Sequence, residues 1–477
     1  MTAPHFRHTL VGWIDPEQLY AAFYGDNPYS FWLDTGGNAS AGVSYLGEGE
    51  RLLWSDSEGV VRLGTVSADA TGEGAAGIRD ALLLPGTFLA ELATRVPAPV
   101  EASGSAENPS FDLGWVGWIG YEEGVAELGL PTQPELSAIP ASALLEVGVV
   151  VACDHASRQI TLVARDEVKR DAWLRRYGDL YTRMVNGDEQ MAVSRILPVP
   201  TASPLPSWRH SDSDYRALIT TCQEQIRRGN AYQLCLTNRV TVGLSPPPFP
   251  LYQRLRASSP THHGGLIRVG ECSLVSATPE QFLAVTPRGV VRTAPIKGTR
   301  PRAESVGDDA ATILELRGNA KERAENVMIV DLMRNDIQRV ADIGSVQVTT
   351  LHRVETYAHV HQLVSTVEAR LRRGMTAVDA LRACFPAGSM TGAPKLSAMQ
   401  ILHSVEGGPR GIYAGVWGYL SDNGTTDLAM VIRSIMLDGN VATIGTGGGI
   451  TIDSVIEAEL AEIKIKAAAP LQALLGP

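Results

Sequence analysis

The chain has 477 residues, of which 41 are Lys or Arg and 52 are Asp or Glu, so its formal net charge is −11. This length allows two to four domains of about 100–200 residues each, or one large two-lobed unit. With 44% apolar and 19% charged residues, the composition is that of a globular chain. Because affinity for nucleic acids comes mainly from Lys and Arg on phosphates, an acidic chain binds polyanions poorly. We therefore expect neither nucleic acid nor a membrane among its partners.

The cysteines and the chain start point to a cytoplasmic protein. Five cysteines are scattered along the chain, and none forms a C-x-x-C pair. This pattern indicates neither a disulfide framework nor a zinc site. The start, MTAPHFRHTLVGWIDPEQ, has no long apolar stretch, and no run of about 18 apolar residues occurs, so we predict no signal peptide and no transmembrane helix.

A proline-rich segment, PVPTASPLPS at 198–207, marks the best boundary, because it cannot continue a helix or a central strand. We predict an N-terminal lobe at 1–197, a linker at 198–210 and a catalytic domain at 211–477. Within the N-terminal part, the patterns predict strands at 30–33 and 114–119 and helices at 78–94 and 168–184.

The C-terminal part begins with a predicted helix over 215–226, capped from within 211–214. Tight turns are predicted at Asn423-Gly424 and Asp438-Gly439. Hairpins followed by helices predict an α+β fold and not a doubly wound parallel sheet. The other predicted elements are strands at 273–277, 282–286, 289–294, 413–420, 428–437 and 441–446, and helices at 317–332 and 456–468.

Two pairs of glutamates have helical spacing: Glu322 and Glu325 in KERAEN, and Glu459 and Glu462 in EAELAE. A spacing of i, i+3 puts both members on one helix face, where like charges repel unless a cation lies between them. Four carboxylates from two helices would suit a hard divalent ion such as Mg²⁺. The alternative is a solvated helix face, although the apolar residues 327–330 indicate a half-buried first helix.

Lys297 lies in the run TAPIKGTRPR, after an apolar β-type stretch and before Gly298. A lysine in apolar surroundings loses its charge more easily and can act as a nucleophile. The local sequence alone is more typical of a lysine in a surface turn.

Three consecutive glycines, Gly447, Gly448 and Gly449, follow a predicted strand in IGTGGGITIDS. Their backbone N–H groups could hold an anion, but the run lacks the spacing of the usual nucleotide loops, and a flexible turn is the alternative. Arg433 lies in the predicted strand AMVIRSIM, where an unpaired charge is costly, so we expect a carboxylate partner from protein or ligand. Lys466 fits either a ligand contact or an ordinary helix pair with Glu462.

Taken together, these runs resemble the chorismate-utilising enzymes, and within them the component I branch of the aminodeoxychorismate synthases. The resemblance covers residues 215–468 and is looser in the N-terminal runs SFWLDTG and GWIGYEE. It implies a two-lobed α+β fold of large, mainly antiparallel sheets covered by helices. The runs that carry it are AYQLCLTNR, SATPEQF, TAPIKGTRPR, KERAENVMIVDLMRND, FPAGSMTGAPK, RGIYAGVWGY and GTGGGITIDSVIEAELAE.

The family resemblance implies chorismate as substrate and Mg²⁺ as the cofactor that lets an acidic pocket bind an anion. The implied metal ligands are Glu322, Glu325, Glu459 and Glu462. Tyr413 and Arg433 match positions that hold the enolpyruvyl side of the substrate. The other implied substrate-binding residues are Gln233, Thr299, Ser389, Gly447, Gly448, Gly449 and Lys466.

The family resemblance implies that two positions determine which reaction occurs. Gln233 stands where the water-adding isochorismate and salicylate synthases carry a lysine base, so addition of water at C2 is disfavoured. Lys297 stands where anthranilate synthases usually carry alanine. Its amine is implied to attack C2 while the C4 hydroxyl leaves, protonated by the general acid Glu280, before ammonia adds at C4 and expels the lysine.

A further departure lies in the run VHQLVS, where Gln362 stands in place of a histidine of the anthranilate synthases. It argues further against anthranilate formation. The role of His361, the neighbouring residue, is left open.

The implied product is 4-amino-4-deoxychorismate, a precursor of 4-aminobenzoate and folate. Because no cysteine lies in the G-x-C-x-G turn of a triad-type glutaminase, we expect ammonia from a separate glutamine amidotransferase subunit. SFWLDTG resembles a segment that lines a buried tryptophan site in relatives, although core packing alone would explain Phe31 and Leu33. Two alternatives stay open: anthranilate synthase component I, and a non-catalytic subunit that binds an aromatic amino acid or a partner.

Overall fold

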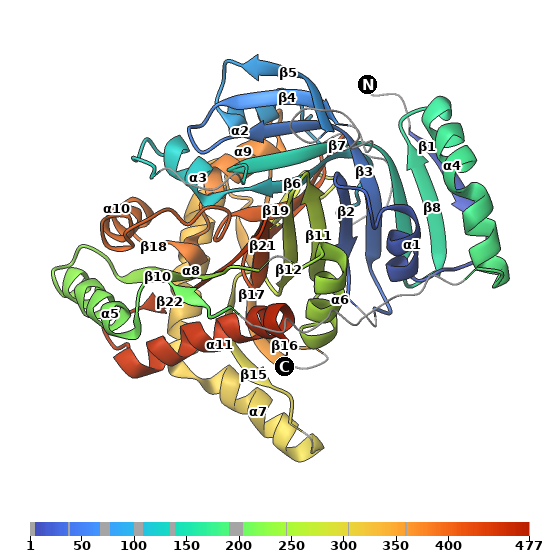
Figure 1. The fold of residues 1–477 in the computed structure, drawn as a ribbon. Helices are drawn as coiled ribbons and strands as arrows, with labels where there is room; N and C mark the ends of the chain where they lie inside the picture. Colours follow the sequence, from blue (N-terminus) through green and yellow to red (C-terminus); the bar gives the residue numbers. More distant parts are fainter. Residues whose placement is uncertain are drawn as a thin grey trace.

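The computed structural model describes residues 5–36, 39–66, 77–99, 108–133, 139–189, 204–244, 246–303, 305–357 and 360–476. Its strands form a large antiparallel network with helices packed on its outer faces, so the predicted α+β fold is confirmed (Figure 1). Eleven α-helices are described: α1 (Pro16–Phe23), α2 (Phe88–Ala93), α3 (Tyr121–Glu127), α4 (Glu167–Asn186), α5 (Asp212–Arg227), α6 (Pro248–Ser258), α7 (Val306–Gly318), α8 (Ala320–Gln338), α9 (Ala377–Cys384), α10 (Lys395–Val405) and α11 (Ile456–Leu475).

The strands of the described residues, in chain order, are β1 (Phe6–Leu10), β2 (Ser30–Asp34), β3 (Val43–Ser55), β4 (Val61–Val66), β5 (Ile78–Leu84), β6 (Gly114–Ile119), β7 (Ser142–Asp154), β8 (Gln159–Ala164), β9 (Ser207–Trp208), β10 (Gln233–Val242), β11 (His263–Val269), β12 (Cys272–Thr278), β13 (Gln281–Val285), β14 (Val290–Thr293), β15 (Ile296–Pro301), β16 (Gln347–Thr356), β17 (Val360–Arg370), β18 (Gly392–Ala393), β19 (Val416–Ser421), β20 (Thr426–Met430), β21 (Ser434–Asp438) and β22 (Val441–Ile450).

Two runs of paired strands meet at the long strands β3 and β7. One run is β1-β8-β7-β3-β2-β11-β12-β21-β22-β10. The other leaves β7 through β6-β19-β20-β13-β14-β17, and β15 and β16 also pair with β17. The β3–β7 ladder shifts register between Gly47 and Arg51, and such bulges bend a strand. The bend lets the same two strands serve both runs.

Strands from both sides of the predicted linker pair directly with each other. β2 pairs with β11, and β6 pairs with β19, where Trp118 lies opposite Trp417. The two parts of the chain therefore share their sheets. The division into lobes at 198–210 stays a prediction, and residues 198–203 of that segment lie outside the described ranges.

The helix predicted over 78–94 is wrong. Residues 78–84 form β5, and α2 begins only at Phe88, after Thr87 accepts a hydrogen bond from Ala90 N. Pro85-Gly86 separates the two elements, because proline and glycine interrupt a helix. The helix predicted over 317–332 is split at Asn319, which caps α8.

The predicted strand over 428–437 is also two strands. β20 ends at Met430 and β21 starts at Ser434, and Arg433 lies in the break with φ +52°. Arg433 is thus outside a strand, contrary to the prediction. β22, in contrast, is longer than predicted and runs through the three glycines to Ile450.

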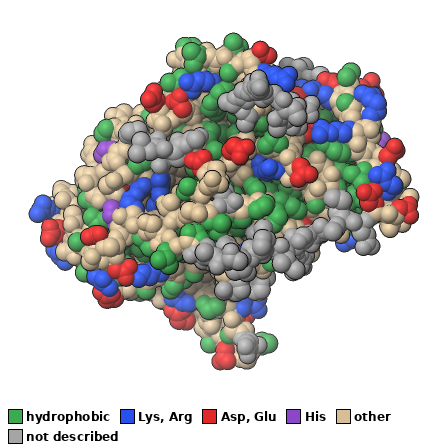
Figure 2. Space-filling model, in the orientation of Figure 1, with side chains coloured by type: hydrophobic (Ala, Val, Ile, Leu, Met, Phe, Trp, Pro, Cys, Tyr) green, Lys and Arg blue, Asp and Glu red, His purple; other side chains and the backbone are tan. Residues whose placement is uncertain are grey.

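Charged side chains of both signs are mixed on the face of the molecule drawn in Figure 2. Figure 2 shows Lys and Arg lying among Asp and Glu on the face drawn, and among its described residues no large basic patch is visible. No helix in the described ranges is both long and apolar enough to cross a membrane.

Candidate active site

The three glycines of β22, Gly447 to Gly449, form one wall of the candidate site, the glycine wall. Residues 447–449 pair with β10 in regular antiparallel register, so the flexible turn considered for this run is wrong. A Cβ on Gly448 would lie 3.1 Å from Glu459 Oε2, and a Cβ on Gly449 would overlap with Gln233 Nε2. The absence of side chains at these positions lets Glu459 and Gln233 approach the strand closely.

Two helices bring the four predicted metal ligands to this wall. α8 carries Glu322 and Glu325, and its N-terminus is fixed by Asn319, whose side chain accepts a hydrogen bond from Glu322 N at 3.1 Å. α11 packs against β22 and carries Glu459 and Glu462. The i, i+3 spacing therefore places both pairs on faces that meet one cavity.

That cavity has a volume of about 510 Å³, within the range of roughly 300–1,000 Å³ typical of small-molecule sites. It is bounded by β22, β15, α8, α11 and the turn around Ser389. Fourteen of the fifteen predicted site residues line it: Glu280, Lys297, Thr299, Glu322, Glu325, Ser389, Tyr413, Arg433, Gly447, Gly448, Gly449, Glu459, Glu462 and Lys466.

Lys321 lies between the carboxylates of the two helices. Its Nζ is 3.8 Å from Glu325 Oε1 and 3.8 Å from Glu459 Oε1. Burial raises the pKa of both carboxyls, and repulsion adds to the effect, from Glu322 on Glu325 and from Glu462 on Glu459. A cation in the cavity is what allows these groups to be ionised together.

The donor set fits a hard divalent cation in kind, since these four side chains offer only carboxylate oxygens. In the part of the chain that the structure describes, no group of three or more His, Cys, Asp or Glu is arranged to hold a metal ion. The ammonium of Lys321 lies among the carboxylates instead. The assignment of the glutamates to Mg²⁺ stays a prediction.

Glu280 is a buried carboxyl in the opposite part of the cavity. Ser389 Oγ donates a hydrogen bond to Glu280 Oε1 at 2.9 Å. Burial raises the pKa of Glu280, while the Ser389 hydrogen bond and the charges of Lys297 and Lys466 partly oppose the rise. The environment therefore favours the protonated form, which is the form a general acid needs.

Lys297 lies on β15 where its ladder with β17 shifts register. Its side chain is 16% exposed, and Nζ is 3.9 Å from Glu325 Oε2. A Cβ on Gly449 would lie 3.7 Å from the same nitrogen, so the amine faces the glycine wall. Lys297 thus lies on a strand in partly charged surroundings, and not in the surface turn of which its local sequence is typical.

The two other predicted cations differ in their partners. Lys466 Nζ lies 2.6 Å from Glu462 Oε1 and donates to the carbonyl of Gly447 at 2.8 Å, so it both pairs within the helix and faces the cavity. Arg433 lines the cavity, and burial lowers the pKa of its guanidinium, while Tyr413 and Glu462 partly oppose that change. A carboxylate partner from protein or ligand stays a prediction.

Gln233 is the one predicted residue that does not line the cavity. It lies buried behind Gly449, and within the described chain its Oε1 has no hydrogen-bond partner. Its side chain therefore packs behind the three glycines of β22.

Several lining residues were missed by the sequence analysis. They come from neighbours of the recognised motifs or from strand alternation, which puts residue i+2 on the same face. Lys321 precedes the first glutamate pair, and Cys235 is two residues after Gln233, so both signals were available. The residues missed include Cys235, Pro279, Ile296, Arg300, Lys321, Met390, Ile432 and Ile465.

Gln362 and His361 lie on opposite faces of β17. Gln362 lines the cavity and donates through Nε2 to Thr299 Oγ1 at 3.4 Å. His361 is fully buried away from it, with Nε2 2.8 Å from Asp309 on α7 and Nδ1 2.9 Å from Thr356 on β16. The hydrogen bonds of His361 therefore link β17, α7 and β16.

The N-terminal run SFWLDTG contributes both to the core and to a second cavity. Phe31 is fully buried in the core. Leu33 lines a second cavity of about 380 Å³, together with Tyr45, Trp417 and Tyr419.

Comparison with known proteins identifies the same enzyme family as the sequence motifs. The profile of the chorismate binding enzymes matches residues 50–472. An aminodeoxychorismate synthase of Streptomyces griseus is 37% identical over 468 residues, covering 97% of this chain and 63% of the relative. The chain thus spans less than two thirds of that relative's length.

Two proteins of another name are also similar. Anthranilate synthase component 1 of Streptomyces coelicolor is 36% identical over 384 residues, covering 77% of this chain and 73% of the relative. The crystal structure of anthranilate synthase component I from Streptococcus pneumoniae TIGR4 superposes with a TM-score of 0.74 at 26% identity, covering 91% of this chain and 93% of that one.

The placement of His361 predicts a structural effect without a catalytic one. Replacing His361 with Phe removes its hydrogen bonds to Asp309 and Thr356, which join β17 to α7 and β16. We expect a lower melting temperature, while kcat and KM for chorismate stay within about threefold of the wild type. Calorimetry and steady-state rates check this. A loss of turnover of about 30-fold at an unchanged melting temperature would contradict it.

Proposed function

We propose a function from the premise that this chain belongs to the family of chorismate binding enzymes. In this proposal it aminates chorismate at C4 and gives 4-amino-4-deoxychorismate. One observation carries the proposal: Lys297 and Glu280, a potential nucleophile and a potential general acid, face the same cavity. The name of the Streptomyces griseus relative, aminodeoxychorismate synthase, supports it.

In the proposed first step, the Lys297 amine attacks C2 of the ring. Its electron pair forms the C2–N bond, the two ring double bonds each shift by one bond toward C4, and the C4–O bond breaks. Glu280 gives its proton to the departing hydroxyl, which leaves as water. The proton released by the lysine nitrogen replaces the one that Glu280 gave.

In the second step, ammonia attacks C4 and the double bonds shift back. The C2–N bond to Lys297 breaks, and the lysine nitrogen takes a proton as it leaves. The sum is chorismate plus ammonia giving aminodeoxychorismate plus water, and the enolpyruvyl side chain is kept. The chain's part is to hold the amine and the acid on one ring.

Charge complementarity supports a dicarboxylate substrate. Arg433 and Lys466 present positive charge to the cavity, and the N–H groups around the glycine wall add hydrogen-bond donors. Glu322, Glu325, Glu459 and Glu462 would hold Mg²⁺, which would neutralise their charge and attract a substrate carboxylate.

The proposal includes partners and a second ligand. A separate glutamine amidotransferase subunit would supply ammonia, and the product would enter 4-aminobenzoate and folate synthesis in the cytoplasm. Gel filtration of the chain with such a subunit tests the first point. We also propose that the second cavity, lined by Leu33 and Trp417, takes tryptophan, which calorimetric titration with the amino acid tests.

Anthranilate synthesis is the second candidate, and the names of two similar proteins favour it. It requires amination at C2 and loss of pyruvate. The cavity of this chain has Gln362 where we expected a histidine in that branch, and it contains the amine of Lys297 close to Gly449. These two differences favour the C4 route.

Product identity tests the proposal. The purified chain is incubated with chorismate, Mg²⁺ and ammonium chloride, with and without an aminodeoxychorismate lyase, and the products are identified by mass spectrometry. We expect 4-aminobenzoate only when the lyase is present, and no turnover when EDTA removes the metal. Fluorescent anthranilate formed without lyase would refute the proposal, and Mg²⁺-dependent chorismate binding without turnover would support a non-catalytic subunit.

The covalent route predicts a large effect of Lys297→Ala. Without the amine, C4 amination should fall at least about 100-fold in kcat, with a smaller change in KM for chorismate. Lys464→Ala is the matched control, because Lys464 is an exposed lysine of α11 that pairs with Asp212. Turnover like that of the wild type in Lys297→Ala would rule out the covalent route.

The contact between Ser389 and Glu280 predicts a shifted pH profile. The hydrogen bond from Ser389 stabilises the carboxylate, so its loss in Ser389→Ala should raise the pKa of Glu280 further. A general acid works only while protonated, so the alkaline limb of kcat against pH should move to higher pH. Ser389→Thr keeps a hydroxyl and should keep the limb near its wild-type position. A limb that moves to lower pH in the alanine variant would contradict the assignment.

A further inference from the structure

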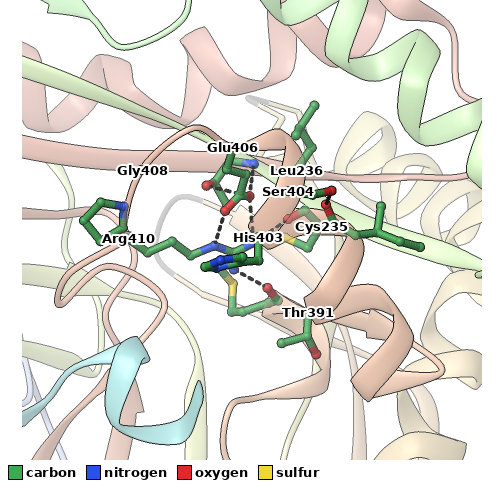
Figure 3. Close-up of polar contacts among 12 residues, drawn as sticks. Cys235, Leu236, Thr391, His403, Ser404, Glu406, Gly408 and Arg410 are labelled. Atoms are coloured by element: carbon green, nitrogen blue, oxygen red, sulfur yellow. Dashed lines mark hydrogen bonds and ion pairs between the residues drawn. The ribbon is translucent and has the colours of Figure 1, made fainter. Parts of the chain in front are cut away.

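A buried ion pair lies behind the wall of the cavity. Arg410 donates through Nη2 to Glu406 Oε1 at 2.8 Å and through Nε to Glu406 Oε2 at 2.9 Å (Figure 3). The two side chains are only 2% and 5% exposed. Neither residue lines the 510 Å³ cavity, and the proposed reaction gives neither of them a role.

The remaining donors of the guanidinium hold two backbone carbonyls of the cavity wall. Nη1 donates to the carbonyl of Met390 at 2.6 Å, and Nη2 donates to the carbonyl of Cys235 at 2.9 Å. Met390 and Cys235 both line the cavity. Arg410 therefore joins the 3₁₀ turn Gly388–Met390 to β10 from behind.

Glu406 completes the same edge of β10. Its Oε1 accepts hydrogen bonds from Thr237 N at 2.9 Å and from Thr237 Oγ1 at 2.8 Å. β18 pairs with β10 only at Gln233 and Leu234. Beyond that point the ion pair takes the place of a neighbouring strand. Arg410 donates to the carbonyl of Cys235, and Glu406 accepts from the N–H of Thr237.

The N-terminal part of the chain holds Arg410 in turn. The ring of Tyr121 lies with its centroid 4.4 Å from the guanidinium carbon, and the backbone N–H of Arg410 donates to Glu122 Oε1 at 2.8 Å. Both residues lie on α3. The guanidinium is thus fixed from several sides, which suits a group that sets the position of others.

The turn that Arg410 holds also carries the residue bound to Glu280. Ser389 precedes Met390 in the turn, and its hydroxyl donates to Glu280 Oε1 at 2.9 Å. A change in the Met390 carbonyl therefore moves the hydroxyl on the acid. On its other edge, β10 pairs with the glycines of β22, so the same guanidinium also sets the glycine wall.

We propose that Arg410, held by Glu406, is a positioning residue that fixes the 388–390 turn and β10 against each other. It thereby keeps Ser389 on Glu280 and keeps Cys235 in the cavity wall. Stability alone does not account for this pair, because well-packed apolar residues often replace a buried ion pair without loss of stability. The inference rests on the proposed function only where it uses Glu280 as the acid.

The test uses Arg410→Lys, which keeps the charge but loses the fork that reaches both carbonyls. Glu406→Gln is the second variant, in case the first does not fold. Arg256→Lys is the matched control, because Arg256 is a buried arginine paired with Asp34 and Glu17 and does not line the cavity. Folding is checked by circular dichroism and melting temperature.

Two readouts are measured. The first is the steady-state rate of chorismate consumption with Mg²⁺ and ammonium, whatever the product. We expect kcat to fall about 10- to 100-fold in Arg410→Lys with KM within about threefold. In a Ser389→Ala background the same change should cost less kcat than it does alone, since part of its effect passes through the hydrogen bond from Ser389 to Glu280.

The second readout needs no turnover, so it separates this inference from the proposed function. The rate of Cys235 alkylation by iodoacetamide, located by mass spectrometry, should rise at least about fivefold in Arg410→Lys and in Glu406→Gln, and not in Arg256→Lys. Unchanged Cys235 reactivity in both folded variants would overturn the proposal. So would a loss of kcat in Arg410→Lys that adds in full to that of Ser389→Ala.

Discussion

Repulsion among four carboxylates confined to one cavity is the constraint on which this structure depends. Glu322 and Glu325 on α8 and Glu459 and Glu462 on α11 line one cavity, and burial raises the pKa of Glu325 and of Glu459. Lysines are placed to offset them, Lys321 between the helices and Lys466 on Glu462. The proposed divalent cation would add to the positive charge of these lysines and hold a substrate carboxylate.

Strand pairing connects the cavity to both the N-terminal and the C-terminal parts of the chain. β22 lies between α11 and β10, and its glycines let carboxylates approach the strand. β10 is held on its other edge by Glu406 and Arg410, and Arg410 contacts α3. Since β6 pairs with β19 and β2 with β11, the N-terminal part is also a structural support of the site.

Local spacing allowed much of the site to be predicted. The i, i+3 glutamate pairs, the capped helix that starts at Asp212 and the strands around residues 273–293 all follow from short-range patterns. Family resemblance added residues that no pattern marks, such as Ser389. The wrong predictions, the helix over 78–94 and the strand through Arg433, each overlooked a local break in an apolar run.

Other features could not be predicted because they join distant residues. Whether Gly447 to Gly449 form a turn or a strand depends on β10, more than 200 residues earlier in the chain. Arg410 lies in a recognised run, yet its bond to Cys235 spans 175 residues. Lys321 joins α8 to α11, and the pattern of neither helix shows the other.

The central claim is that Lys297 and Glu280 act on opposite parts of one chorismate ring. A crystal structure of the Glu280→Gln variant with Mg²⁺ and chorismate tests it most directly. The account predicts that Lys297 Nζ lies next to C2 and that residue 280 lies within hydrogen-bond distance of the C4 hydroxyl. A ring bound with C4 away from residue 280, or with Lys297 paired to a substrate carboxylate, would contradict it.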